Sequence, residues 1–333
     1  MKLRAGIIGL GVGEAHIAAY NAHPQCKVEA ICDLSETKLS QMRQKYGIAK
    51  ATQDADAILS DPEIEIVSIA SYDNDHYAQI VKAIQKGKHV FVEKPFCLYA
   101  KEARHIRELW KASPEIKISS NLVLRKSPRF LRLKNMVATG LFGDLFYVEG
   151  DYHYGRLHKI TEGWRGQMDF YSVVYGGGVH MIDLLLWLTG DSILEVTAYG
   201  NRIASHGSAF RYNDCVVAIL KFQSGIIGKM TVDFGGVQSH FHGLSLHGTK
   251  ATFVNNLPHG KLFVSRDSNV PAQEVTDTYP GVLKGDLIDS FVNSIIHDSP
   301  AVVSTEDAFR AMSVCFAIEE SVQNRQSIKV QYI

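Results

Sequence analysis

The sequence predicts an α/β fold in which an N-terminal Rossmann domain with a doubly wound parallel sheet precedes an α+β domain with a large, mostly antiparallel sheet. Up to about residue 120, apolar strand-like runs alternate with amphipathic helical stretches, a pattern typical of parallel sheets with helices on both faces. Beyond that point, apolar runs come in adjacent pairs joined by short turns. The 333 residues suffice for two domains, predicted at residues 1–120 and 121–333.

Four apolar runs in the first half predict buried strands separated by helices. The helix that follows Ser35 has apolar residues at helical spacing and reaches Gly47, where a helix commonly ends. The next long helix turns apolar residues inward and polar residues outward up to Gly87. The predicted strands are residues 3–10, 28–32, 64–70 and 89–92.

Paired apolar runs in the second half predict an antiparallel sheet that helices cover on one face. Residues 216–222 and 226–234 flank Gln223-Ser224-Gly225, which is a good hairpin signal. The flanking helices are predicted at residues 127–140, 180–188, 283–296 and 304–320.

Composition argues against several classes of partner. Lys plus Arg number 35 and Asp plus Glu also 35, so no net field attracts nucleic acid or an acidic membrane surface. The N-terminal apolar segment is too short and glycine-broken for a signal peptide, and no run is long enough to cross a bilayer. The five cysteines show no disulfide-type or metal-type pairing, which favours a reducing cytoplasm.

A glycine-rich turn directly follows the first predicted strand and opens the first helix. In Gly9-Leu10-Gly11-Val12-Gly13, all five residues are candidates to contact a dinucleotide, because glycine lets the backbone approach a pyrophosphate at a helix N-terminus. Glu14 occupies the position of the usual third glycine, and Gly13 comes one residue early. An ordinary strand-to-helix turn is the alternative.

Asp33 closes the second predicted strand, 20 residues beyond Gly13. A carboxylate there accepts hydrogen bonds from the adenosine ribose and repels the extra phosphate of NADP, so NAD is the predicted cofactor. Lys38 keeps NADP open as a less favoured alternative. Asp33 could instead serve as a turn residue ahead of Ser35.

The fourth predicted strand in this half ends in a specific motif, Gly-Lys-His-Val-Phe-Val-Glu-Lys-Pro at residues 87–95. It resembles the glucose-fructose oxidoreductase/inositol dehydrogenase/rhizopine-catabolism (Gfo/Idh/MocA) family, whose members mostly oxidise or reduce sugars and polyols, and the resemblance extends along nearly the whole chain. It implies that Lys94 is catalytic, binding the reacting oxygen beside the nicotinamide, and that Glu93 and Lys94 contact the cofactor. A lysine cation can polarise a carbonyl or stabilise an alkoxide. A solvated loop lysine is the alternative.

Further cofactor contacts follow from the same resemblance. Residues 71–76 stand where the family usually has Thr-Pro-Asn and a later His; Ser71 and His76 match, whereas Tyr72 and Asp73 depart from the pattern. The resemblance places Ser71, Tyr72 and His76 under the cofactor and Asn121 near the nicotinamide. His76 is equally well explained as a structural histidine at a helix start.

Residues 176–183, Gly-Gly-Gly-Val-His-Met-Ile-Asp, resemble the family's Asp-x-Gly-x-His-x-x-Asp segment, with Gly176 in place of the first Asp. The resemblance implies that His180 is the general acid/base, a role that suits imidazole because its pKa lies near neutrality. Asp183 lies three residues on and shares a helix face with His180, so it could orient the ring or contact substrate. A histidine packed in the core is the alternative.

Substrate contacts are predicted for Arg165 and Tyr175 in addition to Asp183, and Tyr154 and Arg156 are further candidates. His153, His158 and His180 raise the idea of a zinc site. Their spacing is not that of a compact ligand set and the expected chemistry needs no metal, so none is predicted.

The leading function is NAD-dependent hydride transfer at a sugar, polyol or sugar-derivative hydroxyl. One alternative is NAD-dependent glycoside hydrolysis through transient oxidation, and another is a non-catalytic NAD-binding regulatory protein. Since the sheet face without helices needs cover, we also expect a homodimer or homotetramer.

Overall fold

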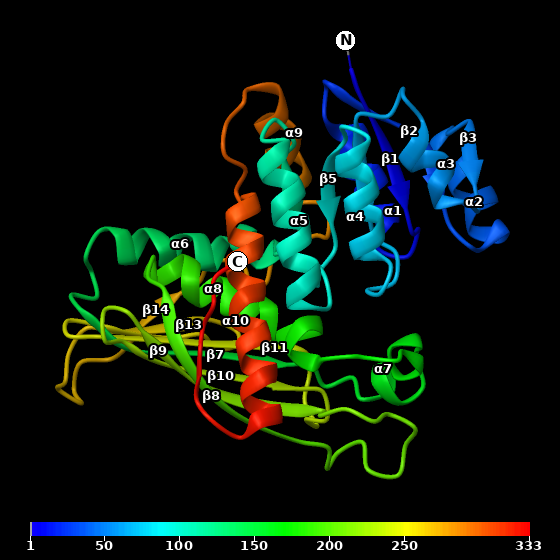
Figure 1. The fold of residues 1–333 in the computed structure, drawn as a ribbon. Helices are drawn as coiled ribbons and strands as arrows, with labels where there is room; N and C mark the ends of the chain where they lie inside the picture. The colour runs from blue at the N-terminus through cyan, green and yellow to red at the C-terminus, as the bar shows by residue number, and fades with distance from the viewer. Residues whose placement is uncertain (1) are drawn as a thin grey trace. The chain divides into compact units, whose positions relative to one another are not determined.

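The computed structural model describes residues 2–333, which form two compact units (Figure 1). The first unit contains the chain up to residue 123 together with residues 282–309 and residue 333. The second contains residues 124–281 and 310–332. Residues 282–309 lie beyond the boundary predicted at residue 120, yet they pack with the first unit.

The first unit is built on a six-stranded parallel sheet of order β3-β2-β1-β4-β5-β6, as predicted from the alternating pattern. The order reverses between β1 and β4, and ligands of doubly wound folds bind at the carboxyl ends of strands at such a point. The strands are β1 (Leu3–Ile8), β2 (Cys26–Cys32), β3 (Lys50–Thr52), β4 (Ile66–Ile69), β5 (His89–Val92) and β6 (Ile118–Ser120).

Helices cover this sheet because each has one apolar side. For example, α4 buries Ile80, Ala83 and Ile84. The N-terminus of α2 is capped by Ser35, which accepts from Lys38 N at 3.4 Å. Helices α1 and α9 pack together, while α4 packs with α3 and α5. Their bounds are α1 (Gly13–Ala22), α2 (Glu36–Tyr46), α3 (Ala55–Ser60), α4 (His76–Gln85), α5 (Ala100–Ala112) and α9 (Ile288–Ile296).

The return segment before α9 lies close to α1. A Cβ atom on Gly285 would lie 2.6 Å from Cβ of Ala19 and 2.9 Å from the carbonyl oxygen of Ala15. Only glycine allows this approach. The helix predicted from residue 283 begins later, at Ile288, after this close approach.

The second unit contains the predicted mostly antiparallel sheet, with nine strands in the order β14-β13-β12-β11-β7-β10-β9-β8-β15. The pair β7 and β10 is parallel, and the other neighbours are antiparallel. The strands are β7 (Leu145–His153), β8 (Ile193–Asn201), β9 (Cys215–Phe222), β10 (Ile227–Asp233), β11 (Phe241–Gly248), β12 (Thr252–Val254), β13 (Gly260–Phe263), β14 (Gln273–Val275) and β15 (Ile328–Lys329).

Helices lie on one side of this sheet (Figure 1). Strand β9 turns Val216, Ala218 and Leu220 into the core and leaves Val217 and Ile219 exposed on the opposite face. Within residues 2–333, no helix has the length and hydrophobicity needed to cross a membrane. The helical segments of this part of the chain are η1 (Val123–Lys126), α6 (Pro128–Ala138), α7 (His158–Thr161), η2 (Trp164–Gln167), η3 (Val174–Gly178), α8 (Val179–Thr189) and α10 (Thr305–Asn324), the last beginning in the first unit.

The packing of α9 on the first unit predicts a stability effect. Phe291 is fully buried, and its ring centroid lies 5.5 Å from that of Phe91 on β5. We expect Phe291→Ala to lower the free energy of unfolding by about 3–5 kcal/mol, because it removes a buried aromatic side chain and leaves a cavity. Denaturant unfolding measures the effect, with Leu283→Ala as the exposed control. Equal stability of the two variants would contradict the packing.

Candidate functional site

The glycine turn after β1 is shaped by a close contact with the chain that follows β4. Gly9 has a φ of 87°, and a Cβ atom there would lie 2.2 Å from the carbonyl oxygen of Ala70. Its N–H donates to the carbonyl of Cys32 at 2.8 Å. No other residue type fits at this position. The turn is thus held between the carboxyl ends of β1, β2 and β4.

The rest of the turn opens outward at the start of α1. Nothing lies within 4 Å of a Cβ atom built on Gly11, and Val12 is exposed. The N-cap of α1 makes no side-chain hydrogen bond. The first N–H groups of a helix without such a cap form a natural anion site. Gly13, by contrast, is buried, and a Cβ atom there would lie 2.9 Å from Ile7, so it allows the helix to pack closely on the strand.

Asp33 makes the turn contact with Ser35 that was considered for it and also binds the glycine turn. One carboxylate oxygen accepts from the N–H of Leu10 in the glycine turn at 2.8 Å, and the other accepts from the N–H of Ser35 at 2.9 Å. Lys38 places its ammonium 3.7 Å from the same carboxylate. Asp33 therefore orders the turn and the start of α2 at the end of β2, where a ribose is expected in this fold.

His76 links two loops at the carboxyl edge of the sheet. Its Nδ1 lies 2.7 Å from the carbonyl oxygen of Pro95, and its Nε2 lies 3.3 Å from that of Ser71. Ser71 itself donates its hydroxyl to Gln79 at 2.8 Å, whereas Tyr72 is exposed. Because both ring nitrogens of His76 face main-chain carbonyls, the geometry favours a structural role for this residue.

A buried hydrogen-bond network surrounds Glu93 at the end of β5. Asn121 donates its side-chain N–H to Glu93 at 2.6 Å and to the carbonyl of Lys284 at 2.8 Å. His16 on α1 places Nε2 3.4 Å from Glu93 and Nδ1 2.9 Å from the hydroxyl of Ser68. Four segments far apart in the sequence therefore meet at one carboxylate.

Glu93 favours its charged form even though its side chain is buried. Burial alone raises the pKa of this carboxyl, but the hydrogen bond from His16 and the positive charges of Lys284, His16 and Lys94 outweigh it, so the pKa lies well below its ordinary value. Lys94 itself is half-buried and directly follows Glu93. The side-chain oxygen of Asn121 is buried without a hydrogen-bond partner among the described residues.

His180 lies in the second unit, at the start of α8, and is buried. Its imidazole stacks on the ring of Tyr152, with centroids 6.0 Å apart and an interplanar angle of 16°. Tyr152 also contacts the rings of Tyr154, His240 and His242. The predicted acid/base residue thus borders an aromatic cluster formed by β7 and β11 and by the residues next to them, Tyr154 and His240.

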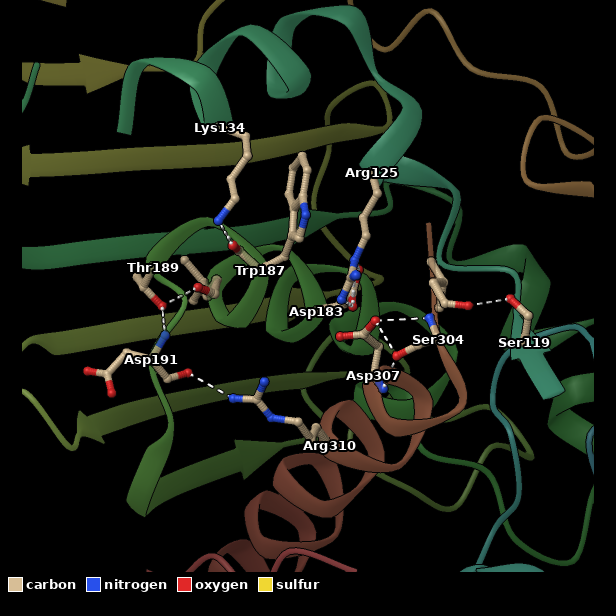
Figure 2. A network of polar contacts seen from close by, with 12 residues as sticks. Ser119, Arg125, Lys134, Asp183, Trp187, Thr189, Asp191, Ser304, Asp307 and Arg310 are labelled. Carbon is tan, nitrogen blue, oxygen red and sulfur yellow. Dashed lines mark hydrogen bonds and ion pairs between the residues drawn. The ribbon is translucent and has the colours of Figure 1, made fainter. Parts of the chain in front are cut away.

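Asp183, one turn further along α8, forms a buried ion pair with Arg125 (Figure 2). Arg125 donates Nε–H to both carboxylate oxygens at 3.1 and 3.0 Å and Nη2–H to one of them at 2.6 Å. The guanidinium also lies 5.8 Å from the ring of Trp187. A paired arrangement of this kind holds α8 in a defined orientation.

The other predicted substrate residues have different surroundings. Arg165 lies over the ring of Trp164 at 4.5 Å, and its charge acts on Tyr152 of the aromatic cluster. Tyr175 is buried and packs edge-on against Phe170 and Phe316, which favours a packing role.

Several neighbours of these residues are absent from the sequence-based prediction: His16, Tyr152, His240 and His242. His242 pairs with Tyr152 across β11 and β7, so register rather than proximity in the sequence brings them together. His16 alone carries a detectable signal, a polar residue on the first helix after a glycine turn. In residues 2–333, no three His, Cys, Asp or Glu side chains are grouped so as to hold a metal ion.

Two family models cover nearly the whole chain. One, described as an oxidoreductase family with an NAD-binding Rossmann fold, matches residues 3–119. The other, described as the C-terminal alpha/beta domain of the oxidoreductase family, matches residues 134–330.

Known proteins with similar sequences or folds agree with these matches. The chain is 24% identical to myo-inositol 2-dehydrogenase of Thermotoga maritima over 99% of both chains, and 26% identical to scyllo-inositol 2-dehydrogenase (NAD(+)) of Bacillus subtilis over 78% of this chain and 75% of the relative. Levoglucosan dehydrogenase in complex with NADH superposes with a TM-score of 0.88 at 21% identity over 100% of both chains. Myo-inositol 2-dehydrogenase from Lactobacillus plantarum gives 0.84 at 20% identity, over 99% of this chain and 100% of that one.

The charge of Glu93 predicts a pH-dependent stability effect. A carboxyl whose folded-state pKa is lowered stabilises the fold above its ordinary pKa of about 4.3, and this stabilisation is lost as the pH falls toward the folded-state value. We expect Glu93→Gln to lower the free energy of unfolding by about 1–3 kcal/mol at pH 7 and by less at pH 3.5. Denaturant unfolding at both pH values measures this, with the exposed Glu108→Gln as control. A difference independent of pH would contradict the assigned charge.

Proposed function

Because this chain belongs to the oxidoreductase family that joins an NAD-binding Rossmann fold to an α/β C-terminal domain, we propose that it transfers hydride between NAD and a hydroxyl-bearing carbon of a sugar, polyol or sugar derivative. Membership in this family confirms the resemblance that the sequence motifs indicated. The chain is therefore an oxidoreductase. The observation that carries the proposal is Lys94 beside the anchored Glu93, at the same sheet edge as the glycine turn. Relatives named as inositol dehydrogenases support a polyhydroxylated substrate.

The first unit has the features that NAD requires. The open space at Gly11 and the uncapped start of α1 suit a pyrophosphate, and Asp33 suits a ribose diol while disfavouring the phosphate of NADP. The buried oxygen of Asn121 is an acceptor that the amide group of a nicotinamide would satisfy. When bound, NAD supplies the hydride acceptor for the reaction.

Two residues of the chain are proposed to stabilise charge on the reacting oxygen and to transfer its proton. In the proposal, Lys94 binds the reacting oxygen and stabilises negative charge on it, and His180 accepts the hydroxyl proton during oxidation and returns it during reduction. The Arg125–Asp183 pair fixes the helix that bears His180. All five cysteines are free thiols, which agrees with the proposed cytoplasmic location.

The primary test is NADH formation at 340 nm over a panel of inositols, sugars and sugar nucleotides, with NAD and NADP compared. We expect turnover with NAD on at least one compound. Lys94→Ala and His180→Ala should each lower kcat/KM by at least about 100-fold, because each removes a group that handles charge or a proton at the reacting oxygen. Calorimetric NAD titration of both variants is the control for folding and cofactor binding.

The outcomes separate the alternatives. Loss of turnover in both variants with NAD binding retained supports the dehydrogenase. Tight NAD binding without turnover on any compound would contradict it, and release of sugar from glycosides without net NADH would identify the hydrolytic reaction. Absence of both activities would favour a regulatory protein.

We also propose that the sheet face without helices is covered by a second copy of the chain. It exposes Val217 and Ile219 on β9 and Ile227 on the neighbouring strand β10, where Ile227 pairs with Lys221. We expect a dimer or tetramer by light scattering coupled to size exclusion, and Ile219→Lys should dissociate it, since a charge would be buried at the interface. Leu131→Lys on α6 is the exposed control. A monomeric wild-type protein at micromolar concentration would contradict this assembly.

A further inference from the structure

Residues 176–178 are three buried glycines whose turn continues directly into α8. None of them adopts the left-handed backbone region, so space rather than backbone freedom explains them. A Cβ atom on Gly176 would lie 2.1 Å from the hydroxyl oxygen of Tyr171, and one on Gly177 would lie 2.5 Å from the ring of Tyr152. Real Cβ atoms do not come this close to other atoms, and the glycines therefore make room for two tyrosines.

The ring of Tyr171 is buried among aromatic side chains. It is 2% exposed and packs edge-on against Phe210 and Phe234, with centroid distances of 6.2 and 6.3 Å. Its hydroxyl lies directly at the backbone of Gly176. The polar end of this side chain is therefore fixed where a side chain of residue 176 would begin.

That location is close to His180 along the chain. Residue 176 lies in the π-helical turn Val174–Gly178, and His180 follows it by four residues at the start of α8, so the two positions are about one helical turn apart. Tyr152, at the neighbouring glycine, stacks on the imidazole of His180. The ring of Tyr152 thus contacts both Gly177 and the imidazole of His180, and the hydroxyl of Tyr171 lies at the adjacent residue, Gly176.

The electrostatic surroundings of His180 come from several elements. The imidazole stacks on the ring of Tyr152, and the titratable groups that contact this ring or act on it are Tyr154, Arg156, Arg165, His240, His242 and Tyr279. On α8 itself, Asp183 is paired with Arg125. The segments packed against this helix also carry Lys134, Glu149, Asp151 and Cys315.

We propose that Tyr171 is a further active-site residue, whose hydroxyl replaces a side chain at residue 176 as the polar group beside His180 and hydrogen bonds a hydroxyl of the substrate. This inference rests on the proposed dehydrogenase function. A phenol is uncharged near neutrality, whereas the family segment that residues 176–183 resemble has an aspartate at the position of Gly176. In the proposal, His180 therefore accepts and returns the substrate proton with a neutral group, rather than a carboxylate, at residue 176.

The kinetic test removes only the hydroxyl. With the substrate identified by the panel, Tyr171→Phe should lower kcat/KM by about tenfold, the effect of one lost hydrogen bond, without a larger change in melting temperature than its control. Tyr212→Phe is that control, because Tyr212 packs on the same Phe210. Equal kcat/KM in the two variants would show that Tyr171 only packs, and would overturn the inference.

A second test does not depend on turnover. NMR titration of labelled histidine, with the His180 signal assigned by its loss in His180→Gln, compares Tyr171→Ala with Tyr171→Ala combined with Gly176→Asp. A carboxylate on the His180 face should raise the pKa of His180 by about one, because a nearby anion favours imidazolium. An unchanged pKa would overturn the inference even if the protein oxidises a polyol. If the pKa rises while no compound is turned over, the placement of Tyr171 beside His180 stands and the proposed reaction fails.

Discussion

The carboxylate of Glu93 is buried at the end of β5, and the first unit is arranged to compensate it. Removing a charge from water costs several kcal/mol unless hydrogen bonds and opposite charge replace the lost hydration. Here His16 and Asn121 supply those bonds, and Asn121 also binds the carbonyl of Lys284. Helix α1, the ends of β5 and β6 and the returning segment must therefore keep one relative position. The glycine turn leads directly into that same helix, so its geometry depends on this carboxylate.

The same interaction bears on how Lys94 acts. Lys94 directly follows Glu93 and supplies one of the positive charges that lower the pKa of this carboxyl. A lysine that keeps its proton is suited to stabilising negative charge on oxygen and poorly suited to shuttling a proton. The proton then has to pass to another group, and imidazole is the side chain whose two forms are both accessible near neutrality. This division of roles agrees with the assignment of His180.

Patterns local in sequence predicted the parallel sheet, the hairpin of β9 and β10 and the glycine turn, because each depends on residues within about ten positions of one another. Contacts set by strand register could not be predicted in this way. The meeting of Tyr152 with His242 requires the pairing of β7 with β11, and the parallel pairing of β7 with β10 leaves no local signal. The ion pair of Asp183 could not be predicted either, because its partner, Arg125, is 58 residues away in the sequence.

Gly176 illustrates why a motif compared position by position can mislead. A chemical group is needed at a place in space, and any segment that reaches that place can supply it. Residue 176 is a glycine without a side chain, and the hydroxyl of Tyr171, five positions upstream, occupies the space where that side chain would begin. Two aromatic neighbours pack against that ring and restrict the position of its hydroxyl. Since the replacement is neutral, the change affects the charge beside His180 more than the shape of the site.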